Sequence, residues 1–180
     1  MAKLPILTFP AKSLKETSVP VEEVTSRITD LVKDMFETMY DAQGIGLAAP
    51  QIGENINLLV MDVKKPDPID DEKEISNPIC LINPEIIQSE GIMEYEEGCL
   101  SCPELLVMVE RAQSILVKAL DAEGRPIEHK LTDLEAVCTQ HEMDHLKGML
   151  LTDYISRLKR DIYRKQRVRL REDEDDTGDV

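Results

Sequence analysis

The chain of 180 residues has no tryptophan and only two phenylalanines, so aromatic side chains contribute little to its interior. Aliphatic residues and eight methionines must fill the core instead. Hydrophobic residues make up 42% of the sequence and charged residues 32%, which is an ordinary balance for a folded globular protein. The length is sufficient for one domain with a sizeable core.

Basic residues are outnumbered, because 21 lysines and arginines stand against 36 aspartates and glutamates, giving a formal net charge of -15. This balance excludes a uniformly basic nucleic-acid binder, and we expect no DNA partner. The exception is local: residues 157–171 carry eight bases and one acid, whereas residues 172–179 are mostly acidic.

Long apolar runs are also missing. No stretch approaches the length of a transmembrane helix, and Pro5 and Pro10 interrupt the only apolar residues that precede the first predicted helix. We therefore expect a cytoplasmic protein with no membrane contact. In that compartment its four cysteines are reduced, so metal ligation or burial is favoured over disulfide bonding.

The spacing of apolar residues predicts three helices, over residues 18–40, 132–148 and 156–170. A capping box of Thr132 and Glu135 is expected to begin the second helix, and Gly148 is expected to end it. Strands are predicted at residues 56–63, 80–87, 105–109, 114–120 and 126–131, and an exposed loop at residues 64–77.

The order of these elements predicts the fold class. Because strands do not alternate with helices, we expect an α+β fold with mixed or mostly antiparallel sheets. The sheets are expected to pack around the second helix, with one helix before them and one after. Residues 1–170 are interpreted as a single catalytic domain, and residues 171–180 as an acidic tail too charged to pack, hence disordered.

The second predicted helix contains the segment QHEMDH, an H-E-x-x-H match. Residues four apart lie on one helix face with a rise of roughly 6 Å, so His141 and His145 can bind one metal ion. Glu142 beside them can transfer protons for a water molecule that the metal activates. The alternative is that these three residues are solvated side chains of a surface helix.

A third metal ligand is not fixed by the motif. A catalytic metal usually has three protein ligands and one open position. The metzincin pattern requires a histidine where this chain has Leu151. An endopeptidase of the thermolysin type requires a downstream glutamate, but Glu172 and Glu174 lie in the acidic tail. These two classes of peptidase are therefore disfavoured, and the third ligand stays open at this point.

Three segments together resemble the peptide deformylase family. They are GIGLAAPQ (residues 44–51), EGCLS (residues 97–101) and QHEMDHLKG (residues 140–148). All three occur in the same order and at the same separation, and the resemblance extends over the whole chain except the acidic tail. It implies hydrolysis of the N-formyl group from the N-terminal formyl-methionine of nascent polypeptides, with release of formate.

The resemblance also implies the composition of the metal centre. It makes Cys99, His141 and His145 the ligands of one Fe(II) ion, with Zn, Ni or Co as substitutes. The residue types alone indicate only that such a site suits Zn, Fe, Co or Ni. Glu142 is interpreted as the base that takes a proton from water and then returns it to the leaving amine.

Two groups are implied to stabilise the oxyanion of the reaction: the side-chain amide of Gln51 and the backbone N–H of Leu100. Without the resemblance, Gln51 is equally a loop residue that satisfies backbone groups. Gly44 and Gly46 allow a backbone to run close to a ligand, so a peptide is expected to bind there as an extended strand. Its methionine side chain is expected in an apolar pocket built partly by Ile45, Val137 and Cys138, each of which is equally compatible with an ordinary core.

Two further features follow from the resemblance. Asp144 is expected to pair with Arg111 and so to support the metal-bearing helix. Cys102 departs from the family, whose members usually have an aliphatic residue there, and is a possible oxidation partner for Cys99. A zinc ribbon is disfavoured because the chain has no second Cys-x-x-Cys.

The basic segment 157–171 is predicted to dock on ribosomal RNA near the nascent-chain exit, as the helical C-terminus of the family also suggests. The alternative is a solvated terminal helix, and the acidic tail would oppose docking. No aromatic-rich patch indicates an interface, so we expect a monomer. For the whole chain, the alternative from another class is a metal-binding or ribosome-binding protein that has lost catalysis.

Overall fold

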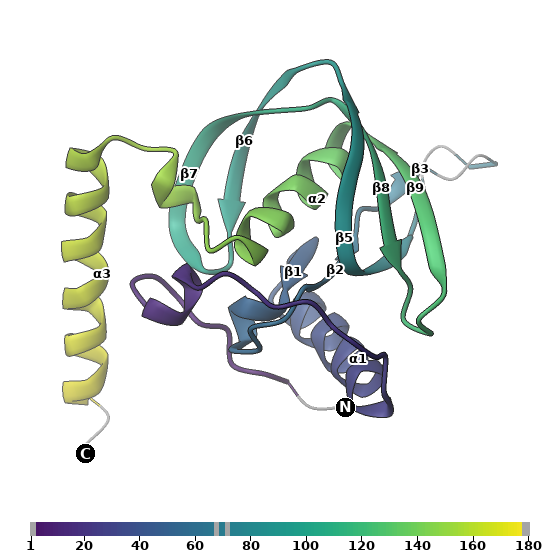
Figure 1. Ribbon diagram of the computed structural model, residues 1–180. Helices are drawn as coiled ribbons and strands as arrows, with labels where there is room; N and C mark the ends of the chain where they lie inside the picture. The colour runs from purple at the N-terminus through teal and green to yellow at the C-terminus, as the bar shows by residue number, and fades with distance from the viewer. Residues whose placement is uncertain (1–2, 67–68, 71–72, 178–180) are drawn as a thin grey trace.

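The computed structural model describes residues 3–66, 69–70 and 73–177 and has an α+β architecture, as predicted (Figure 1). Its α-helices are α1 (Ser26–Asp41), α2 (Asp133–Leu146) and α3 (Arg157–Thr177). Its 3₁₀ helices are η1 (Lys12–Lys15), η2 (Ala49–Ile52) and η3 (Leu151–Asp153). Its strands are β1 (Gly46–Ala48), β2 (Leu58–Asp62), β3 (Lys65–Pro66), β4 (Glu74–Ile75), β5 (Pro78–Glu90), β6 (Met93–Cys99), β7 (Cys102–Arg111), β8 (Ser114–Leu120) and β9 (Pro126–Thr132).

Five strands form one antiparallel sheet in the order β1-β2-β5-β8-β9. The strands β6 and β7 form a separate antiparallel hairpin, and β3 pairs with β4. Helix α2 lies between this hairpin and the five-stranded sheet and contacts both (Figure 1). The predicted arrangement, mostly antiparallel sheets around the motif-bearing helix, is confirmed.

The five-stranded sheet is covered on both faces. All five residues of β2 are buried. Leu59 and Met61 belong to the core cluster with α2, whereas Leu58 and Val60 belong to the cluster with α1. This alternation follows from the two-residue period of a strand. A third cluster joins β7 and η3 to the N-terminal segment and α3, and there the rings of Phe9 and Tyr163 stack at 5.7 Å.

The beginning of α2 differs from the prediction in one respect. The helix starts after Thr132, but the Thr132 side chain makes no capping hydrogen bond, so the predicted capping box is wrong. The carboxylate of Glu135 instead accepts a hydrogen bond from Asn77 Nδ2 at 3.0 Å and pairs with Lys65 Nζ at 2.9 Å. The ion pair with Lys65 therefore engages the Glu135 side chain, which a capping box would need at the start of the helix.

The end of α2 agrees with the prediction. The helix stops at Leu146, and Gly148 follows with φ of +72°. A Cβ atom at this position would lie 2.4 Å from the carbonyl oxygen of Lys15. Glycine is therefore required both by the left-handed conformation and by the close approach of η1.

Helix α1 begins at Ser26, so its predicted start at Ser18 is wrong. Val19 forms a parallel β-bridge with Ile56, and the N–H of Ser18 donates to the carbonyl oxygen of Leu146. These long-range hydrogen bonds engage backbone groups that a helix would otherwise pair internally.

Residues 64–77, which were predicted to be an exposed loop, include the paired strands β3 and β4. Within that range, residues 67–68 and 71–72 lie outside the described residues. In the part of the chain that the structure describes, no helix is long and apolar enough to cross a membrane.

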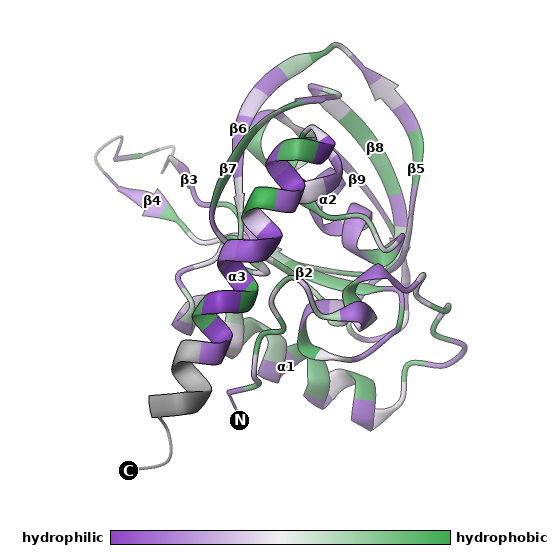
Figure 2. Cartoon of the chain, turned by 90° about the vertical axis from the view of Figure 1, so that its left-hand side faces the viewer, coloured by the Kyte–Doolittle hydropathy of each residue, from purple (hydrophilic) through white to green (hydrophobic). Residues whose placement is uncertain are grey.

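Helix α3 is longer than predicted, because it ends at Thr177 rather than near Leu170. Residues 171–177 are thus helical where a disordered tail was expected, and residues 178–180 lie outside the described residues. No glycine or proline interrupts the segment before Gly178, and its arginine and glutamate residues favour helix. The helix stands at the side of the molecule (Figure 1), and the residues of α3 that carry a hydropathy colour are mostly hydrophilic (Figure 2).

Candidate metal centre

The structure brings together the side chains of Cys99, His141 and His145. One ligand atom from each residue lies within 4.8 Å of the others, and Cys99 Sγ is 3.2 Å from His145 Nε2. The two imidazole rings come from one face of α2, and the sulfur comes from the end of β6. The four-residue spacing in α2 and the packing of the β6–β7 hairpin against that helix therefore build the group.

Strand β6 contacts both histidines through alternate residues. Cys99 reaches His145, and Glu97, two positions earlier, accepts a hydrogen bond from His141 Nδ1 at 2.8 Å. This bond occupies Nδ1 and leaves Nε2 of His141 available as a metal ligand. The sequence reasoning missed Glu97, although its position two residues before Cys99 on a strand was the signal.

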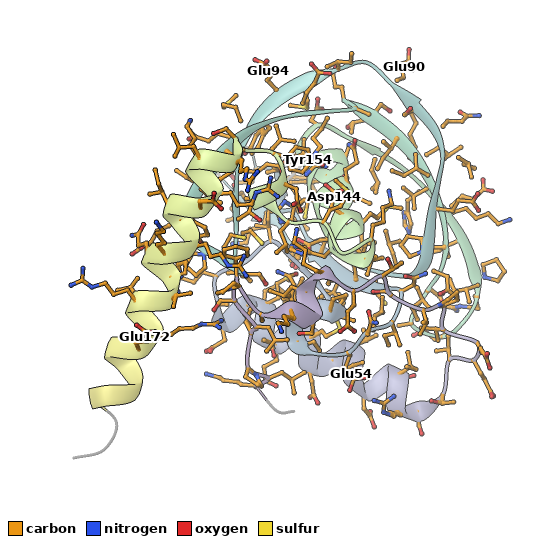
Figure 3. All side chains as sticks on the ribbon, turned by 60° about the vertical axis from the view of Figure 1, so that its left-hand side comes forward. Glu54, Glu90, Glu94, Asp144, Tyr154 and Glu172 are labelled. Carbon is orange, nitrogen blue, oxygen red and sulfur yellow. The ribbon has the colours of Figure 1, made fainter. Side chains whose placement is uncertain are left out.

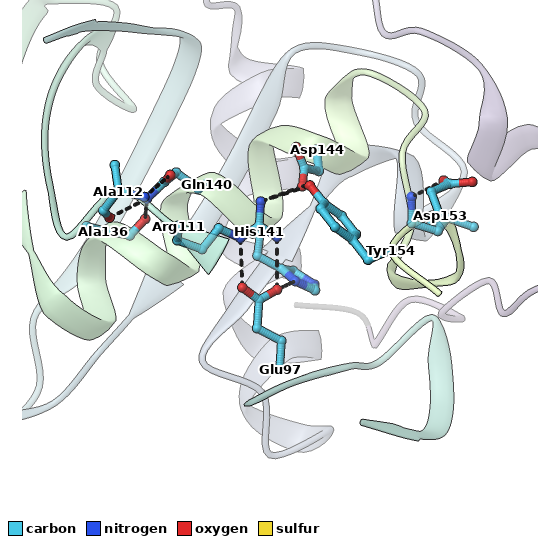
Figure 4. Close-up of polar contacts among 10 residues, drawn as sticks. Glu97, Arg111, Ala112, Ala136, Gln140, His141, Asp144, Asp153 and Tyr154 are labelled. Atoms are coloured by element: carbon cyan, nitrogen blue, oxygen red, sulfur yellow. Dashed lines mark hydrogen bonds and ion pairs between the residues drawn. The ribbon is translucent and has the colours of Figure 1, made fainter. Parts of the chain in front are cut away.

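Glu97 is held as a carboxylate. Arg111 donates to it through Nε at 2.7 Å and through Nη2 at 2.9 Å (Figure 4). Burial alone would raise the pKa of Glu97, but the hydrogen bonds from Arg111 and His141 outweigh burial and lower it. Arg111 Nη1 also pairs with Asp144 Oδ2 at 2.6 Å, so the predicted ion pair is confirmed.

Glu142 follows His141 in α2, and its side chain is buried. It is 4% exposed, and its Oε2 atom has no hydrogen-bond partner among the described residues. Burial raises the pKa of Glu142 to about 7. A Cβ atom on Gly46 would lie 2.5 Å from Glu142 Oε1 and 2.8 Å from Cys138 Sγ, so only glycine allows β1 to run this close.

Gln51 is buried against the same group. Its Oε1 accepts from the N–H of Ala48 at 2.8 Å, which directs the amide nitrogen the other way. Nε2 donates to Ser101 Oγ at 3.1 Å and lies 3.7 Å from Cys99 Sγ. Gln51 thus accepts a hydrogen bond from a backbone N–H, as expected for a loop residue that satisfies backbone groups. It also directs its amide N–H groups towards the site.

A cavity of about 390 Å³ opens onto this group. All five residues predicted for the substrate pocket line it: Gly44, Ile45, Gly46, Val137 and Cys138. Leu100 lines it too and lies so close to Gly44 that a Cβ atom there would be 2.8 Å from Leu100 Cδ1. Besides Glu97, the sequence did not single out five further lining residues, namely Gln43, Tyr95, Glu96, Gly98 and Leu134.

The donor set fits a metal ion. For Zn, metal–sulfur and metal–nitrogen bonds of about 2.3 and 2.0 Å place tetrahedral donors roughly 3.3–3.6 Å apart. The 3.2 Å between Cys99 Sγ and His145 Nε2 is close to this range. Burial lowers the pKa of His145, which keeps its imidazole neutral as ligation requires. The hydrogen bond with Cys102 and burial raise the pKa of Cys99, and a cation at the site would reverse this by stabilising the thiolate.

The remaining cysteines lie outside this donor group. Cys102 is a Cα partner of Cys99 across the β6–β7 turn and is 1% exposed, and both are free thiols. Cys138 lines the cavity, with its Sγ 3.6 Å from the carbonyl oxygen of Ile45. Cys80 is a half-buried free thiol in β5.

Comparison with known proteins gives consistent matches over nearly the whole chain. The family model for polypeptide deformylase matches residues 3–161. The peptide deformylase of Alkalilimnicola ehrlichii is 49% identical over 170 residues, which cover 94% of this chain and 92% of the relative. A crystal structure of a peptide deformylase from Legionella pneumophila has a TM-score of 0.82 and 42% identity, covering 96% of this chain and 98% of that one.

A second solved structure is a peptide deformylase from Acinetobacter baumannii with Met-Ala-Ser bound. It has a TM-score of 0.77 and 31% identity, and the match covers 86% of this chain and 99% of that one. The likeness thus extends from the metal-donor motifs to the complete fold. The chain belongs to the polypeptide deformylase family, metal-dependent hydrolases that remove the N-formyl group from the start of nascent polypeptides.

Proposed function

We propose that this chain deformylates formyl-methionyl peptides at the centre formed by Cys99, His141 and His145, with Glu142 as its acid–base residue. The observation that carries the proposal is the convergence of a sulfur and two imidazoles beside a buried carboxylate oxygen without a partner among the described residues. When bound, the metal supplies Lewis-acid charge that activates water and polarises a carbonyl.

The residues of the chain then divide the remaining work. Glu142 takes a proton from the attacking water and returns it to the amine that leaves, while formate carries the former formyl carbon. Gln51 Nε2 and the N–H of Leu100 donate to the oxyanion that develops on the formyl oxygen. Removal of one such donor typically raises the barrier by about 3–4 kcal/mol.

The peptide is proposed to bind along β1. This strand is at the edge of the five-stranded sheet, and the preceding residues Gly44 and Ile45 line the cavity beside it. An extended peptide can add to such an edge through main-chain hydrogen bonds. The first side chain would enter the apolar part of the cavity next to Val137 and Cys138, where a methionine fits by length and flexibility.

The native metal is proposed to be Fe(II), one per chain, with Zn, Ni or Co as substitutes. One thiolate and two imidazoles form a donor set that accommodates all four ions, so geometry alone does not select among them. Metal analysis of protein purified without oxygen, and again after aerobic handling, tests this proposal. Iron in the first sample and its loss in the second support it, whereas stable zinc in both would contradict it.

The setting of the reaction is also proposed. All donors and the cavity belong to one chain, so a monomer is sufficient, and residues 1–170 would form one catalytic domain. The four free thiols and a nascent-chain substrate suit the cytoplasm.

Helix α3 is proposed to contact ribosomal RNA through its basic residues. Lys165 and Arg169 are exposed on this helix, in a chain whose net charge is -15. Such contacts weaken steeply as salt rises. The double substitution Lys165→Glu with Arg169→Glu is expected to release the protein from purified ribosomes at lower salt than Lys118→Glu on β8. Equal salt midpoints would contradict docking through α3.

The central experiment measures formate released from a formyl-Met tripeptide by Fe(II)-loaded protein kept free of oxygen. The parent is expected to release formate, and Glu142→Ala is expected to lose nearly all activity while keeping its metal. An unformylated peptide with internal bonds serves as the control for an endopeptidase. Cleavage of that control, or no formate from metal-loaded parent protein, would contradict the proposal.

A further inference from the structure

Tyr154 has no role in the reaction described above, yet its hydroxyl is bound on two sides. It follows η3 and precedes α3, and its side chain points towards Asp144 of α2 (Figure 3). The hydroxyl donates to Asp144 Oδ2 at 2.6 Å and accepts from Arg111 Nη1 at 3.2 Å. The Arg111 guanidinium also lies 5.2 Å from the centre of the Tyr154 ring.

These contacts continue to a metal donor. Arg111 donates hydrogen bonds to both carboxylate oxygens of Glu97, and Glu97 accepts a hydrogen bond from His141 Nδ1 (Figure 4). Tyr154 is therefore connected to His141 through two intermediate side chains. Arg111 is 7% exposed and Glu97 is 4% exposed, so the fork that joins them is shielded from water, whereas Tyr154 at the outer end of the network is 38% exposed.

Arg111 must serve two carboxylates with one guanidinium. Its Nε and Nη2 form the fork on Glu97, whereas Nη1 is drawn to Asp144. The Tyr154 hydroxyl gives Asp144 a second hydrogen bond and gives Nη1 a second acceptor, and the guanidinium carbon lies over the tyrosine ring. Since Arg–carboxylate forks depend on coplanarity, this contact keeps the fork aligned with Glu97.

Tyr154 is itself held in place by its chain neighbour. Asp153 pairs with Lys15 of η1 and with Arg160 of α3, and it accepts from the N–H of Leu150. The segment that carries Tyr154 is thus bound to η1 and to α3 through ion pairs of Asp153. Burial raises the pKa of Tyr154 to about 12, so the hydroxyl keeps its proton and remains a donor.

We propose that Tyr154 is a positioning residue for the metal ligand His141, acting through Arg111 and Glu97. By aligning the fork it keeps Glu97 against Nδ1, and this orients Nε2 towards the metal. The inference rests on the proposed metal centre, and it adds a residue outside the three family segments to the shell that supports the ligands. Loss of such outer partners typically lowers metal affinity or activity by about 10- to 100-fold.

The test compares Tyr154→Phe with Tyr163→Phe. Both changes remove one hydroxyl that donates a hydrogen bond, but the Tyr163 hydroxyl donates to the carbonyl oxygen of Pro103 at 2.8 Å and not to the network that ends on His141. Each variant is loaded with Co(II), and three quantities are measured: the visible absorption spectrum, the rate of Co(II) loss to a chelator, and kcat and KM separately. Thermal unfolding controls for a general loss of stability.

Tyr154→Phe is expected to change the Co(II) spectrum, to release the metal about 10-fold faster and to lower kcat with little change in KM. Tyr163→Phe is expected to match the parent in all three. Asp144→Ala removes both the acceptor of the tyrosine and the second carboxylate of Arg111. It should shift the same quantities in the same direction, which tests the network if Tyr154→Phe does not fold.

A parent spectrum and a parent release rate in Tyr154→Phe would overturn the positioning role while leaving the proposed function intact. A parent protein that binds no Co(II) and releases no formate would instead refute the proposed function itself. The two failures are therefore distinguishable in one series of measurements.

Discussion

Helices α2 and α3 both carry many polar side chains, but the fold treats them in opposite ways. In α2, ten of the fourteen residues are buried, including His141, Glu142 and His145. In α3, Tyr163 is the buried residue among those whose side chains are described, and the charged side chains around it face solvent or lie at the margin of the fold. The difference between the two helices shows that polar side chains indicate a functional site only where the fold buries them.

The reason lies in the cost of burial. A buried charge or imidazole is stable only with a partner. In α2, Glu97 meets His141 and Lys65 meets Glu135. The Glu142 oxygen that has no partner among the described residues is left for a ligand. Exposed charges on α3 are solvated and need no fixed geometry. Buried polar groups therefore report function more directly than a larger number of exposed ones.

The largest effect is expected where a buried charge network is broken. Arg111→Met removes the cation shared by Glu97 and Asp144 and leaves both carboxylates uncompensated. We expect the free energy of unfolding to fall by about 3–5 kcal/mol, measured by urea denaturation. Arg125→Met, which breaks the exposed pairs with Asp121 and Glu123, should change it far less. Similar losses in both variants would refute the distinction between the two regions.

A smaller change tests the close approach of β1 to α2. In Gly46→Ala the added Cβ meets Glu142 Oε1 and Cys138 Sγ, so the carboxylate must move. Displacement by about 1 Å should lower kcat/KM by about 100-fold while the protein stays folded. Thermal unfolding of the variant and the parent is the control, because it separates a displaced carboxylate from a general loss of stability. Unchanged activity in Gly46→Ala would mean that Glu142 does not need its observed position.

Asp62 of β2 is a buried carboxylate outside α2, and it is also satisfied by specific partners. Burial alone would raise the pKa of Asp62, but hydrogen bonds from Ser76, Tyr40 and Asn77 outweigh it and hold the pKa below its ordinary value of 3.8. The stabilisation is therefore complete above that pH and is lost as pH falls through the lower, folded-state value.

Asp62→Asn should accordingly be less stable at neutral pH and should show a flatter dependence of unfolding free energy on pH in the acid range. The free energy of unfolding, measured from neutral to acid pH, tests this prediction. Glu128→Gln on β9 is the control. Parallel pH curves for Asp62→Asn and the parent would contradict the assignment.

The smallest effect is expected on α3. Lys165→Glu with Arg169→Glu should leave formate release from a tripeptide within about two-fold of the parent, because exposed substitutions of this kind rarely disturb a fold. Steady-state kinetics on the short peptide measure this. A large loss of kcat would show that α3 contributes to the metal centre beyond the contacts described for Asp153 and Tyr154.

Much of this arrangement was predictable from local patterns. The spacing of His141 and His145 on one helix requires only helical geometry, and the strand β8 was predicted at its observed bounds, residues 114–120. The third donor, Cys99, was not predictable from spacing, because its distance from His145 is set by how the β6–β7 hairpin packs on α2. The resemblance to a family supplied what the local patterns did not.

Two of the errors share one physical cause, which is competition from long-range contacts. Val19 was predicted to be helical but pairs with Ile56, and Glu135 was predicted to cap α2 but pairs with Lys65. Tyr154 was not singled out, because its contacts with Arg111 and Asp144 join residues distant in sequence. Propensity and local motifs do not contain this information.

The most direct test of the account is a Co(II) titration of metal-free protein under reducing conditions, followed by the near-ultraviolet sulfur-to-cobalt absorption band. We predict one Co(II) per chain for the parent and for Cys102→Ala, and loss of the band in Cys99→Ala. A band that persists in Cys99→Ala, or that disappears in Cys102→Ala while the protein stays folded, would contradict the assignment of Cys99, His141 and His145 as the metal centre.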